Sequence, residues 1–497
     1  MTKNKKQKVV IVGGGSAGWM SASALSKLLG KNLEICLIES EEIGRIGVGE
    51  ATIPPLRVFN QLLGIDEQQF MKTTQATFKL GIEFKNWGKL NDNYIHSFGE
   101  TGKICWAGEF QHFWVGGLQK GFDAEFGDYC LELQAARAGK FGMSKQNQLN
   151  YAYHLDAGLY AEYLTNFAET NGVKRIEGKV TDVTVKDGSG YIESVTLENG
   201  DVIEGDLFLD CTGFVGRLIE GALNTGFESY GHLLPCDTAV AVQTEKFGEP
   251  RPYTQAMARD CGWQWRIPLQ HRVGNGLVYC SRYTSDEEAI ASLMSNLESP
   301  AINEPKVFKY KTGRRIKQWN KNCIAIGLSS GFVEPVESTA IHLMMSAILR
   351  LMRLFPHNEI SQANVDEFNN QAKEEMERIR DFIILHYKAT ERDDTAFWRY
   401  CKNMDVPETL AHRMELFKET GRVCITETEL FRIDSWTQCM IGQGIVPENY
   451  HQIVDMMPEQ ELGRFLHGLK NNVDKNVEMM PSHQAFIDKY CKASPIG

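Results

Sequence analysis

The sequence lacks several features that mark common classes of protein. None of its 497 residues lie in a run that approaches the roughly 18 apolar residues of a membrane-spanning helix. It has no excess of positive charge, and a net charge of −11 argues against nucleic acid or an anionic membrane as a partner. Its twelve cysteines include no Cys-x-x-Cys pair, so neither a disulfide framework nor a metal site is predicted. We expect a globular cytoplasmic protein with reduced thiols.

The N-terminus carries the clearest motif. The apolar run Val9–Val12 is too short for a secretion signal and instead predicts a buried parallel strand, which a glycine-rich turn and a helix follow. In this Gly-x-Gly-x-x-Gly pattern, Gly13 permits the tight turn, Gly15 lets the backbone approach a pyrophosphate, and Gly18 allows close packing of helix and strand. The motif predicts dinucleotide binding and by itself leaves FAD and NAD open.

Three later segments bear on the cofactor, and the last of them favours FAD. A second predicted strand ends at Glu39, whose carboxylate can bind ribose hydroxyl groups. The glycine-punctuated segment 44–54 is longer than a simple turn, and such loops commonly line or cover a cofactor. Another buried strand ends at Asp210 and runs into Cys-Thr-Gly. This return of the chain is typical of a flavin site built from two dinucleotide folds.

Segment 332–342 is a candidate site for catalysis and anion binding. It follows a short apolar strand and precedes a helix that Pro356 ends. Ser338 or Thr339 is a candidate N-cap, so free backbone N–H groups and the positive end of the helix dipole would lie here. Such a helix start attracts anions. For these residues alone, an ordinary capped helix with surface glutamates stays the alternative.

Three other segments are ambiguous on their own. Segment 76–87 alternates apolar and polar residues as a strand does, with Lys79 on the polar face, where a lysine is usually solvated. The aromatic residues of segment 96–114 serve either core packing or a wall for a planar ligand. Segment 261–269 places two tryptophans on one face of a strand, which predicts packing or stacking.

The pattern changes toward the C-terminus, where apolar residues repeat at helical spacing among charged ones. We predict a mostly helical substrate-binding domain for residues 357–497, in which the aromatic clusters 397–398 and 431–436 are candidates to face a cleft. Residues 1–356 then form the FAD-binding domain, with an inserted substrate-facing segment around 91–150. The predicted fold class is α/β: a two-dinucleotide-fold domain of the flavin monooxygenase type with a mostly helical C-terminal domain.

Together these segments resemble the flavin-dependent halogenases, the group that includes the tryptophan halogenases, over most of the chain. Trp263-Gln-Trp-Arg-Ile-Pro268 is similar to the family's Trp-x-Trp-x-Ile-Pro signature. The loop 47–54 is similar to its flavin strap. Lys79 matches the family's Phe-Lys position, and Glu337 matches the glutamate of its catalytic Glu-Ser-Thr.

The resemblance implies an activity and a set of site residues. Reduced FAD and oxygen would oxidise bromide or chloride, and the halogen would pass to one carbon of an electron-rich aromatic ring, such as indole or an indole derivative. The implied catalytic residues are Lys79, which receives the oxidised halogen, and Glu337, which polarises it or removes the ring proton. The implied cofactor-binding residues are Gly13, Gly15, Ser16, Ala17, Gly18, Glu39, Gly49, Ala51, Val180, Asp210 and Gly327. The implied halide-binding residues are Ser338, Thr339 and Ala340, and the implied substrate-binding residues are His96, Phe98, Phe431 and Trp436.

Two departures from the family's pattern concern the halide and the substrate. The family usually has glycine after Glu-Ser-Thr, whereas this chain has Ala340, which keeps the backbone N–H and adds a Cβ. Tryptophan-specific members carry a Tyr-Tyr pair and a following acid that hold the polar end of the amino acid, and this sequence contains no Tyr-Tyr. We therefore expect indole or a simple derivative to be a better substrate than free tryptophan.

The sequence also bears on partners and alternatives. A single nucleotide motif, which FAD would occupy, predicts that a separate flavin reductase supplies the reduced cofactor. A homodimer is left open. The first alternative function is an NAD(P)H-dependent flavin monooxygenase that hydroxylates an aromatic ring, a reaction that needs no lysine relay. The second is a flavin-bearing binding or regulatory protein without turnover. Lys79 and the tryptophan signature favour the halogenase.

Overall fold

The structure is a computed structural model that describes residues 6–42, 49–106, 108–143, 148–357 and 359–495. The chain forms two compact units, each assembled from three separate segments. The first unit comprises residues 1–76, 155–232 and 310–376, and the second comprises residues 77–154, 233–309 and 377–497. This division differs from the single boundary expected at residue 356, because each unit contains a sheet whose strands come from more than one of these segments.

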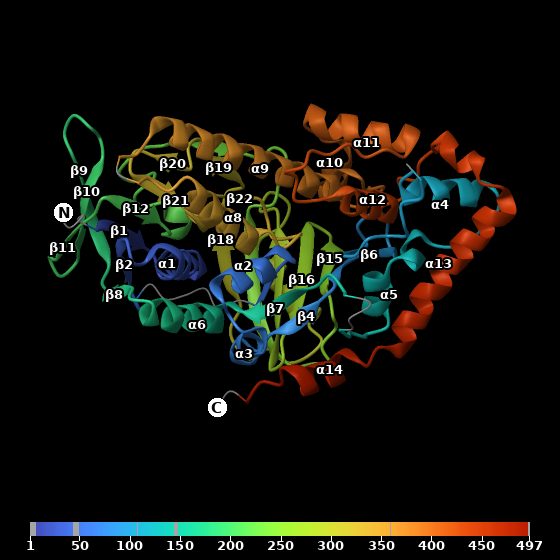
Figure 1. Ribbon diagram of the computed structural model, residues 1–497, viewed down its shortest axis with the longest axis horizontal. Coiled ribbons are helices and arrows are strands. Elements are labelled where there is room, and N and C mark those ends of the chain that lie inside the picture. Colours follow the sequence, from blue (N-terminus) through green and yellow to red (C-terminus); the bar gives the residue numbers. More distant parts are fainter. Residues whose placement is uncertain (1–5, 43–48, 107, 144–147, 358, 496–497) are drawn as a thin grey trace. The chain divides into compact units, whose positions relative to one another are not determined.

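The first unit is built on a six-stranded sheet with the strand order β20-β21-β12-β1-β2-β8 (Figure 1). Its strands are β1 (Gln7–Val12), β2 (Leu33–Glu39), β8 (Lys174–Glu177), β12 (Leu207–Asp210), β20 (Trp319–Asn320) and β21 (Cys323–Ala325). Strand β1 pairs in parallel with both neighbours, so that Val9 lies opposite Ile35 on β2 and Leu207 on β12. Because both faces of such a strand are covered, its middle residues are all apolar and buried.

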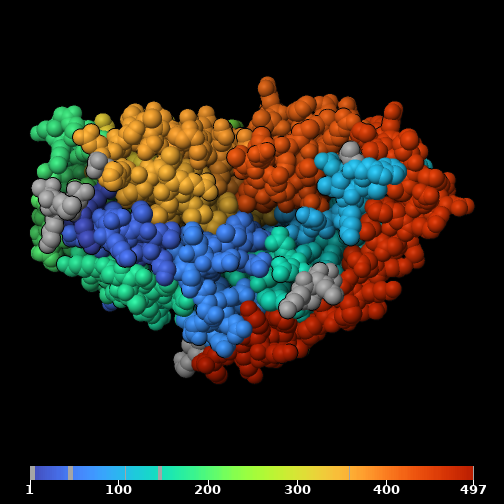
Figure 2. Space-filling view, in the orientation of Figure 1, coloured from blue at the N-terminus to red at the C-terminus, as the bar shows by residue number. Residues whose placement is uncertain are grey.

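Helices and two smaller sheets complete the first unit. The helices are α1 (Ser16–Leu29), α2 (Pro55–Leu63), α3 (Glu67–Thr73), α6 (Ala157–Thr170) and α8 (Ala340–Arg353), with short 3-10 turns η2 (Gly213–Val215) and η3 (Gly327–Ser329). The smaller sheets are β9 (Val180–Val185), β10 (Ile192–Leu197) and β11 (Val202–Glu204), and β13 (Phe227–Ser229), β19 (Gly313–Arg315) and β22 (Gly331–Phe332). Strand β3 (Gly49–Ala51) precedes α2. The blue and green atoms of α1, α2 and α6 lie on one face of this unit in Figure 2.

The second unit is built on a seven-stranded sheet with the order β18-β14-β17-β16-β15-β5-β6. Its strands are β5 (Gly81–Lys85), β6 (Asn93–Ser97), β14 (Thr238–Glu245), β15 (Thr254–Arg259), β16 (Gly262–Pro268), β17 (Arg272–Tyr279) and β18 (Lys306–Lys309). A separate short strand, β4 (Thr77–Lys79), pairs antiparallel with β7 (Ala152–Asp156), and Lys79 lies opposite Ala152.

The second unit also contains helices, some between the strands of this sheet in the chain and others after them. They are α4 (Phe110–Gln119), α5 (Leu131–Arg137), α7 (Asp286–Ser295), α10 (Ala396–Asn403), α11 (Glu408–Thr420), α12 (Ile433–Gly442), α13 (Glu459–Met479) and α14 (His483–Tyr490), with 3-10 turns η1 (Phe126–Tyr129) and η4 (Gln452–Met456). Helix α9 (Gln362–Lys388) begins in the first unit and ends in the second. None of the helices in the described part of the chain combines the length and hydrophobicity needed to cross a membrane.

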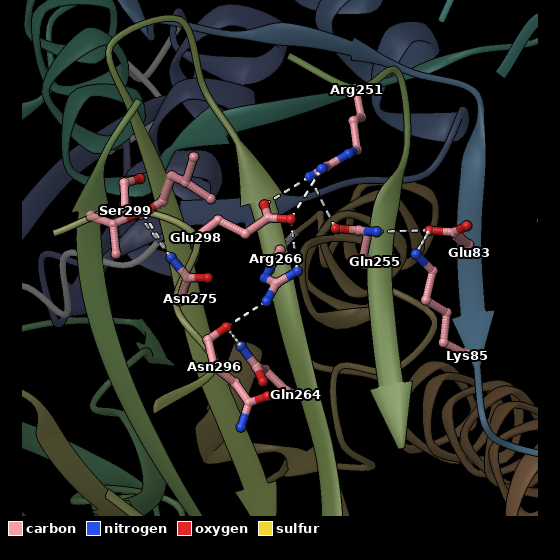
Figure 3. A network of polar contacts seen from close by, with 12 residues as sticks. Glu83, Lys85, Arg251, Gln255, Gln264, Arg266, Asn275, Asn296, Glu298 and Ser299 are labelled. Atoms are coloured by element: carbon pink, nitrogen blue, oxygen red, sulfur yellow. Dashed lines mark hydrogen bonds and ion pairs between the residues drawn. The ribbon is translucent and has the colours of Figure 1, made fainter. Parts of the chain in front are cut away.

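A polar network ties three strands of the second sheet together (Figure 3). Glu298 accepts hydrogen bonds from Arg251 at 2.9 and 3.0 Å and lies 3.1 Å from Arg266 on β16. Gln255 on β15 accepts from Arg251 and donates to Glu83 on β5 at 2.7 Å. Because these groups are partly buried, each would be costly to leave unpaired, so the network helps to hold β5, β15 and β16 in register.

Candidate active site

The glycine-rich turn between β1 and α1 leaves room for a ligand at one position. Gly13 has a φ of +117°, and a Cβ added there would lie 2.2 Å from the carbonyl oxygen of Cys211. A Cβ on Gly18 would lie 1.9 Å from the carbonyl oxygen of Gly13. A Cβ on Gly15, by contrast, would meet no atom of the described chain within 4 Å. The backbone is therefore crowded behind the turn and open at Gly15.

The start of α1 adds a favourable charge at this opening. Gly15 is the N-cap, and within the described residues no side chain caps the helix and no acidic residue lies in its first turn, which begins at Ser16. The N–H groups of this turn and the positive end of the dipole therefore suit an anion. An open approach to the backbone and uncapped N–H groups are what a dinucleotide's pyrophosphate requires, so these residues fit FAD.

Glu39 ends β2 close to the same turn. Its carboxylate accepts hydrogen bonds from Trp19 Nε1 at 3.2 Å and from Arg175 Nε at 2.6 Å. The hydrogen bond to Glu39 raises the pKa of Arg175. A carboxylate at the end of this strand, beside the glycine-rich turn, is placed where a dinucleotide-binding fold binds the ribose hydroxyl groups. The sequence revealed Glu39 but not Arg175, because only the pairing of β8 with β2 brings Arg175 beside it.

Asp210, at the end of β12, accepts hydrogen bonds from the loop that follows it. Its side chain is fully buried and accepts from the N–H and hydroxyl of Thr212 at 3.0 and 2.6 Å, and from the N–H groups of Leu218 and Ile219 at 2.8 Å each. These four donors use the acceptor capacity of one carboxylate. Asp210 therefore shapes the loop after β12, and a direct bond to a cofactor is not needed to satisfy it.

The other predicted cofactor residues lie in different parts of the first unit. Gly327 has a φ of +78°, and a Cβ there would lie 2.8 Å from the Cβ of Ala17, so η3 meets the start of α1. Val180 is half-buried on β9, in a separate small sheet. The structure therefore brings Gly327 and Ala17 together with the glycine-rich turn, whereas Val180 belongs to another sheet.

The predicted flavin strap, 47–54, can be described from Gly49 onward. Residues 43–48, which include Gly47, lie outside the described residues, and β3 contains Gly49 and the buried Ala51. Between them, burial raises the pKa of Glu50 to about 7. Glu50 therefore titrates near neutral pH, and sequence reasoning did not single it out because burial is not readable from the motif.

Glu337 lies in a strained turn before α8. Its side chain is 0% exposed. Two non-glycine residues beside it have left-handed backbones, Glu334 with a φ of +66° and Ser338 with a φ of +59°. Each such residue costs about 1–2 kcal/mol, and strain of this kind collects at functional sites. The turn therefore has the character of a site rather than of an ordinary connection.

The first turn of α8 is open to an anion. Thr339 occupies the N-cap position, as predicted, but its side chain makes no capping bond, so the expected side-chain cap is not formed. Thr339 is 1% exposed, and its buried hydroxyl has no hydrogen-bond partner in the described chain. No acidic residue lies in the first turn, which begins at Ala340. Uncapped N–H groups beside a buried hydroxyl suit a small anion.

A charged network joins α8 to α9. Glu375 accepts from Arg350 at 2.6 Å and from Ser346 at 2.9 Å, and it lies 3.1 Å from His342 Nε2. Burial alone would raise the pKa of Glu375, but the bonds and charges of His342 and Arg350 hold it at about 2. Glu375 is therefore ionised at working pH and joins α8 to α9. The sequence pattern showed Glu375 only as one charge on a helical face.

Lys79 is buried in the second unit. It ends β4 with 0% of its surface exposed, and its Nζ lies 5.2 Å from the ring centroid of the half-buried Phe98. An ammonium group at this distance from an aromatic ring is attracted by the ring's negative face. The solvated lysine that a lone strand pattern suggests is therefore not what the fold contains.

Three predicted substrate residues meet in an aromatic cluster of the second unit. The ring of His96 lies 5.6 Å from Phe382 and 6.3 Å from Phe431, and Phe382 stacks on Phe431 at 3.8 Å. Trp436 packs edge-on against Phe382 at 4.8 Å, and its indole N–H has no hydrogen-bond partner in the described chain. Phe382 was missed as a site candidate because it lies on the apolar stripe of α9.

The other predicted aromatic cluster does not face a cleft. Phe397 and Trp398 have no exposed surface, and Trp398 Nε1 donates to the carbonyl oxygen of Arg259 at 2.7 Å. Both rings contact Tyr387. The prediction that this pair lines a cleft is wrong, because the two rings fill the core between helices α9 and α10.

Lys79 and Glu337 belong to different units. Each is buried, and each lies beside a feature that suits chemistry: an aromatic ring for Lys79 and an uncapped helix start for Glu337. That they act on one substrate stays a prediction. These observations define a class of two-unit proteins. One unit is an α/β fold with a dinucleotide-binding turn, and the other has a large mixed sheet and many helices.

Comparison with known proteins gives the family. A family model for tryptophan halogenases matches residues 8–459, so the chain belongs to the tryptophan halogenase family. It is 51% identical to Xcc4156, a flavin-dependent halogenase from Xanthomonas campestris, with a TM-score of 0.97 over 99% of this chain and 100% of that chain. It is 43% identical to BrvH, a flavin-dependent halogenase from Brevundimonas sp. BAL3, with a TM-score of 0.94 over 98% and 99% of the two chains.

A further relative supports the same family assignment. The chain is 38% identical to the tryptophan 6-halogenase SttH of Streptomyces toxytricini, over 84% of this chain and 85% of SttH. The predicted fold class, an FAD-binding α/β fold with a mostly helical C-terminal part, is confirmed. The chain is therefore an enzyme of the flavin-dependent halogenase type, an oxidoreductase whose family implies FAD as the cofactor.

Proposed function

We propose that this enzyme uses reduced FAD, oxygen and a halide to halogenate an electron-rich aromatic ring, and that its substrate class is indole and simple indole derivatives. The observation that carries the proposal is Lys79, which is 0% exposed with its Nζ 5.2 Å from the ring centroid of Phe98. Lysine is among the residues least often fully buried, because desolvating an ammonium group is costly. Buried titratable groups of this kind collect at functional sites.

The proposed chemistry assigns a role to each residue. When bound, reduced FAD supplies the electrons with which oxygen turns the halide into an electrophilic halogen. Lys79 Nζ holds this halogen, either as a haloamine or by a hydrogen bond to hypohalous acid. A ring carbon attacks the halogen with its π electrons, the N–halogen or O–halogen bond breaks, and its electron pair stays on nitrogen or oxygen. Glu337 polarises the halogen carrier or accepts the proton that the ring then loses.

The proposed halide site is the first turn of α8. Thr339 and Ala340 contribute backbone N–H groups there, and the Thr339 hydroxyl offers a further buried donor, whereas the N–H of Ser338 donates to the carbonyl oxygen of Pro335 at 2.9 Å. The methyl group of Ala340 leaves the halide less room to approach these N–H groups than a glycine would. A halide carries no hydrogen-bond donor of its own, so a turn of uncapped donors without an acidic side chain suits it.

The proposed substrate is a ring without an amino-acid head group. His96, Phe98, Phe431 and Trp436 supply aromatic surface, and the sequence lacks the Tyr-Tyr pair that would hold an ammonium and a carboxylate. Burying such groups without partners costs about 1–3 kcal/mol each. A separate flavin reductase supplies the reduced FAD, since the sequence has a single nucleotide motif that the cofactor itself would occupy.

Two substitutions test this proposal, with a surface lysine as the matched control. We expect Lys79→Ala to leave flavin reoxidation within about twofold of wild type and to abolish ring halogenation. Glu337→Gln should slow halogenation by about 10²–10⁴-fold, the range of general acid–base assistance. Lys89→Ala, which removes an exposed lysine ten positions after Lys79, should change neither the rate of flavin reoxidation nor the rate of halogenation. Flavin reoxidation is followed by stopped flow, and brominated indole by its isotope doublet in mass spectrometry.

The result that would overturn the proposal is wild-type halogenation by a folded Lys79→Ala protein. NADH consumption by the isolated chain, coupled to hydroxylation of the ring, would instead support the flavin monooxygenase alternative. If the wild type reoxidises flavin but forms no halogenated product from any of several indoles, the alternative of a flavin-bearing protein that does not turn over a substrate is favoured.

A further inference from the structure

Two buried histidines hold the strand that ends at Lys79. His154, on β7, bonds to Thr77, and His483, at the start of α14, bonds to the backbone of Phe78. His154 has no exposed surface and His483 has 1%. Thr77 and Phe78 are the two residues of β4 that precede Lys79. The last described helix of the chain thus contacts β4, 405 residues away in sequence.

The hydrogen bonds of His483 determine which of its nitrogens carries the proton. The N–H of Phe78 lies 3.1 Å from Nε2, and a backbone N–H can only donate, so Nε2 has no proton. The carbonyl oxygen of Pro250 lies 2.7 Å from Nδ1 and can only accept, so Nδ1 carries the proton. His483 therefore bonds to both backbone groups only as a neutral ring. Burial lowers its pKa to about 4.

The same reasoning applies to His154. The Thr77 hydroxyl donates its one hydrogen to the carbonyl oxygen of Pro268 at 2.7 Å, so it can only accept from His154 Nδ1, which lies 3.0 Å away. In the neutral ring, Nε2 then has no proton and accepts from the Thr254 hydroxyl at 2.9 Å. Burial, and after it the positive charge of Lys79, holds the pKa of His154 well below its usual value.

We propose that His154 and His483 are positioning residues for Lys79, which hold β4 in place as neutral rings bonded to Thr77 and Phe78. This proposal rests on the proposed function of Lys79. The charged or titratable groups that act on His154 are Lys79 and His483 themselves. A proton on Nε2 of His483 would set an N–H against the N–H of Phe78, and a proton on either ring would add a positive charge beside β4. Neutral rings avoid both effects.

The test compares variants by the amount of halogenated product formed for each flavin reoxidised. His483→Leu removes the acceptor of the Phe78 N–H, and we expect this ratio to fall about fivefold or more, as the loss of a buried hydrogen bond predicts. His483→Gln should restore the ratio to within about twofold, because an amide can accept from Phe78 and donate to Pro250. His467→Leu, at an exposed histidine of α13, is the control and should match wild type.

A purely structural role predicts another outcome. It would lower the amount of folded enzyme and the melting temperature of His483→Leu but leave the product ratio of the folded fraction unchanged, which would overturn the proposal. If His483→Leu does not fold, His483→Asn serves instead, since its shorter amide reaches Pro250 but not Phe78. A wild-type ratio in His483→Asn would also overturn the proposal. We expect the same ranking for His154→Leu and His154→Gln.

Lys79→Ala separates the two proposals. If Lys79→Ala halogenates normally, both the lysine relay and the positioning role are wrong. If Lys79→Ala abolishes halogenation while His483→Leu and His154→Leu keep a normal product ratio, the lysine relay stands and only the positioning role is wrong.

Discussion

The buried His483 should make the folded protein sensitive to acid, and His483→Gln should relieve part of that sensitivity. The pKa of His483 lies at about 4 in the folded protein and near 6.5 in the unfolded chain. Below pH 6.5 the unfolded chain therefore binds more protons than the folded protein. Stability is complete above the unfolded pKa and is lost as the pH falls from about 6.5 toward 4.

The size of the effect follows from these two values. They differ by about 2.5 pH units, which corresponds to about 3 kcal/mol once both states are protonated. Between pH 7.5 and pH 5 the loss from this one group is about 2 kcal/mol, because the unfolded chain is then almost fully protonated and the folded protein almost not at all. This is a considerable share of the ~5–15 kcal/mol that stabilises a typical domain.

Urea unfolding at pH 7.5 and pH 5, followed by tryptophan fluorescence, measures this loss. Glutamine does not titrate, so His483→Gln should lose about 2 kcal/mol less than wild type between the two pH values. His467→Gln, at an exposed position, should behave as wild type. Glu50, whose raised pKa has the opposite effect, is present in all three proteins and cancels in the comparison. Equal pH dependence in wild type and His483→Gln would refute the reasoning.

Five further outcomes are expected. Gly15→Ala should change the melting temperature of the FAD-free protein by less than ~2 °C and weaken FAD binding about tenfold or more by fluorescence titration, because its Cβ meets only space that a ligand would fill. Gly13→Ala should instead fail to fold stably, since its Cβ would overlap Cys211. Ala340→Gly should lower the bromide concentration needed for half-maximal halogenation. Competition between equal amounts of indole and tryptophan should give mainly haloindole, and the isolated chain with FAD should not consume NADH.

Local patterns in the sequence were enough to predict the start of the nucleotide-binding unit. The glycines of the turn, the apolar strand before them and Glu39 at the end of the next strand are all determined within about 40 residues. They depend on backbone sterics and strand periodicity, which neighbouring residues set. The position at which α8 starts was predictable for the same reason. The absence of a side-chain cap at that start was not predictable.

Long-range pairing was beyond the reach of these patterns. The contact of Arg175 with Glu39 requires β8 to lie beside β2, and the bond between Phe78 and His483 joins residues 405 apart. The interleaving of the two units has the same origin, because the strands of each sheet come from separated segments. No spacing rule connects such residues, so only the folded chain shows them together.

Burial was likewise decided by tertiary structure. The sequence by itself was enough to pick out the candidate site residues, since Lys79, Glu337 and the aromatic residues stand in recognisable local patterns. It could not show that Lys79 and Glu337 have no exposed surface, or that Phe397 and Trp398 fill the core instead of facing a cleft. Exposure depends on what packs over a side chain from distant segments, and this packing turns a strand lysine into a buried side chain beside an aromatic ring.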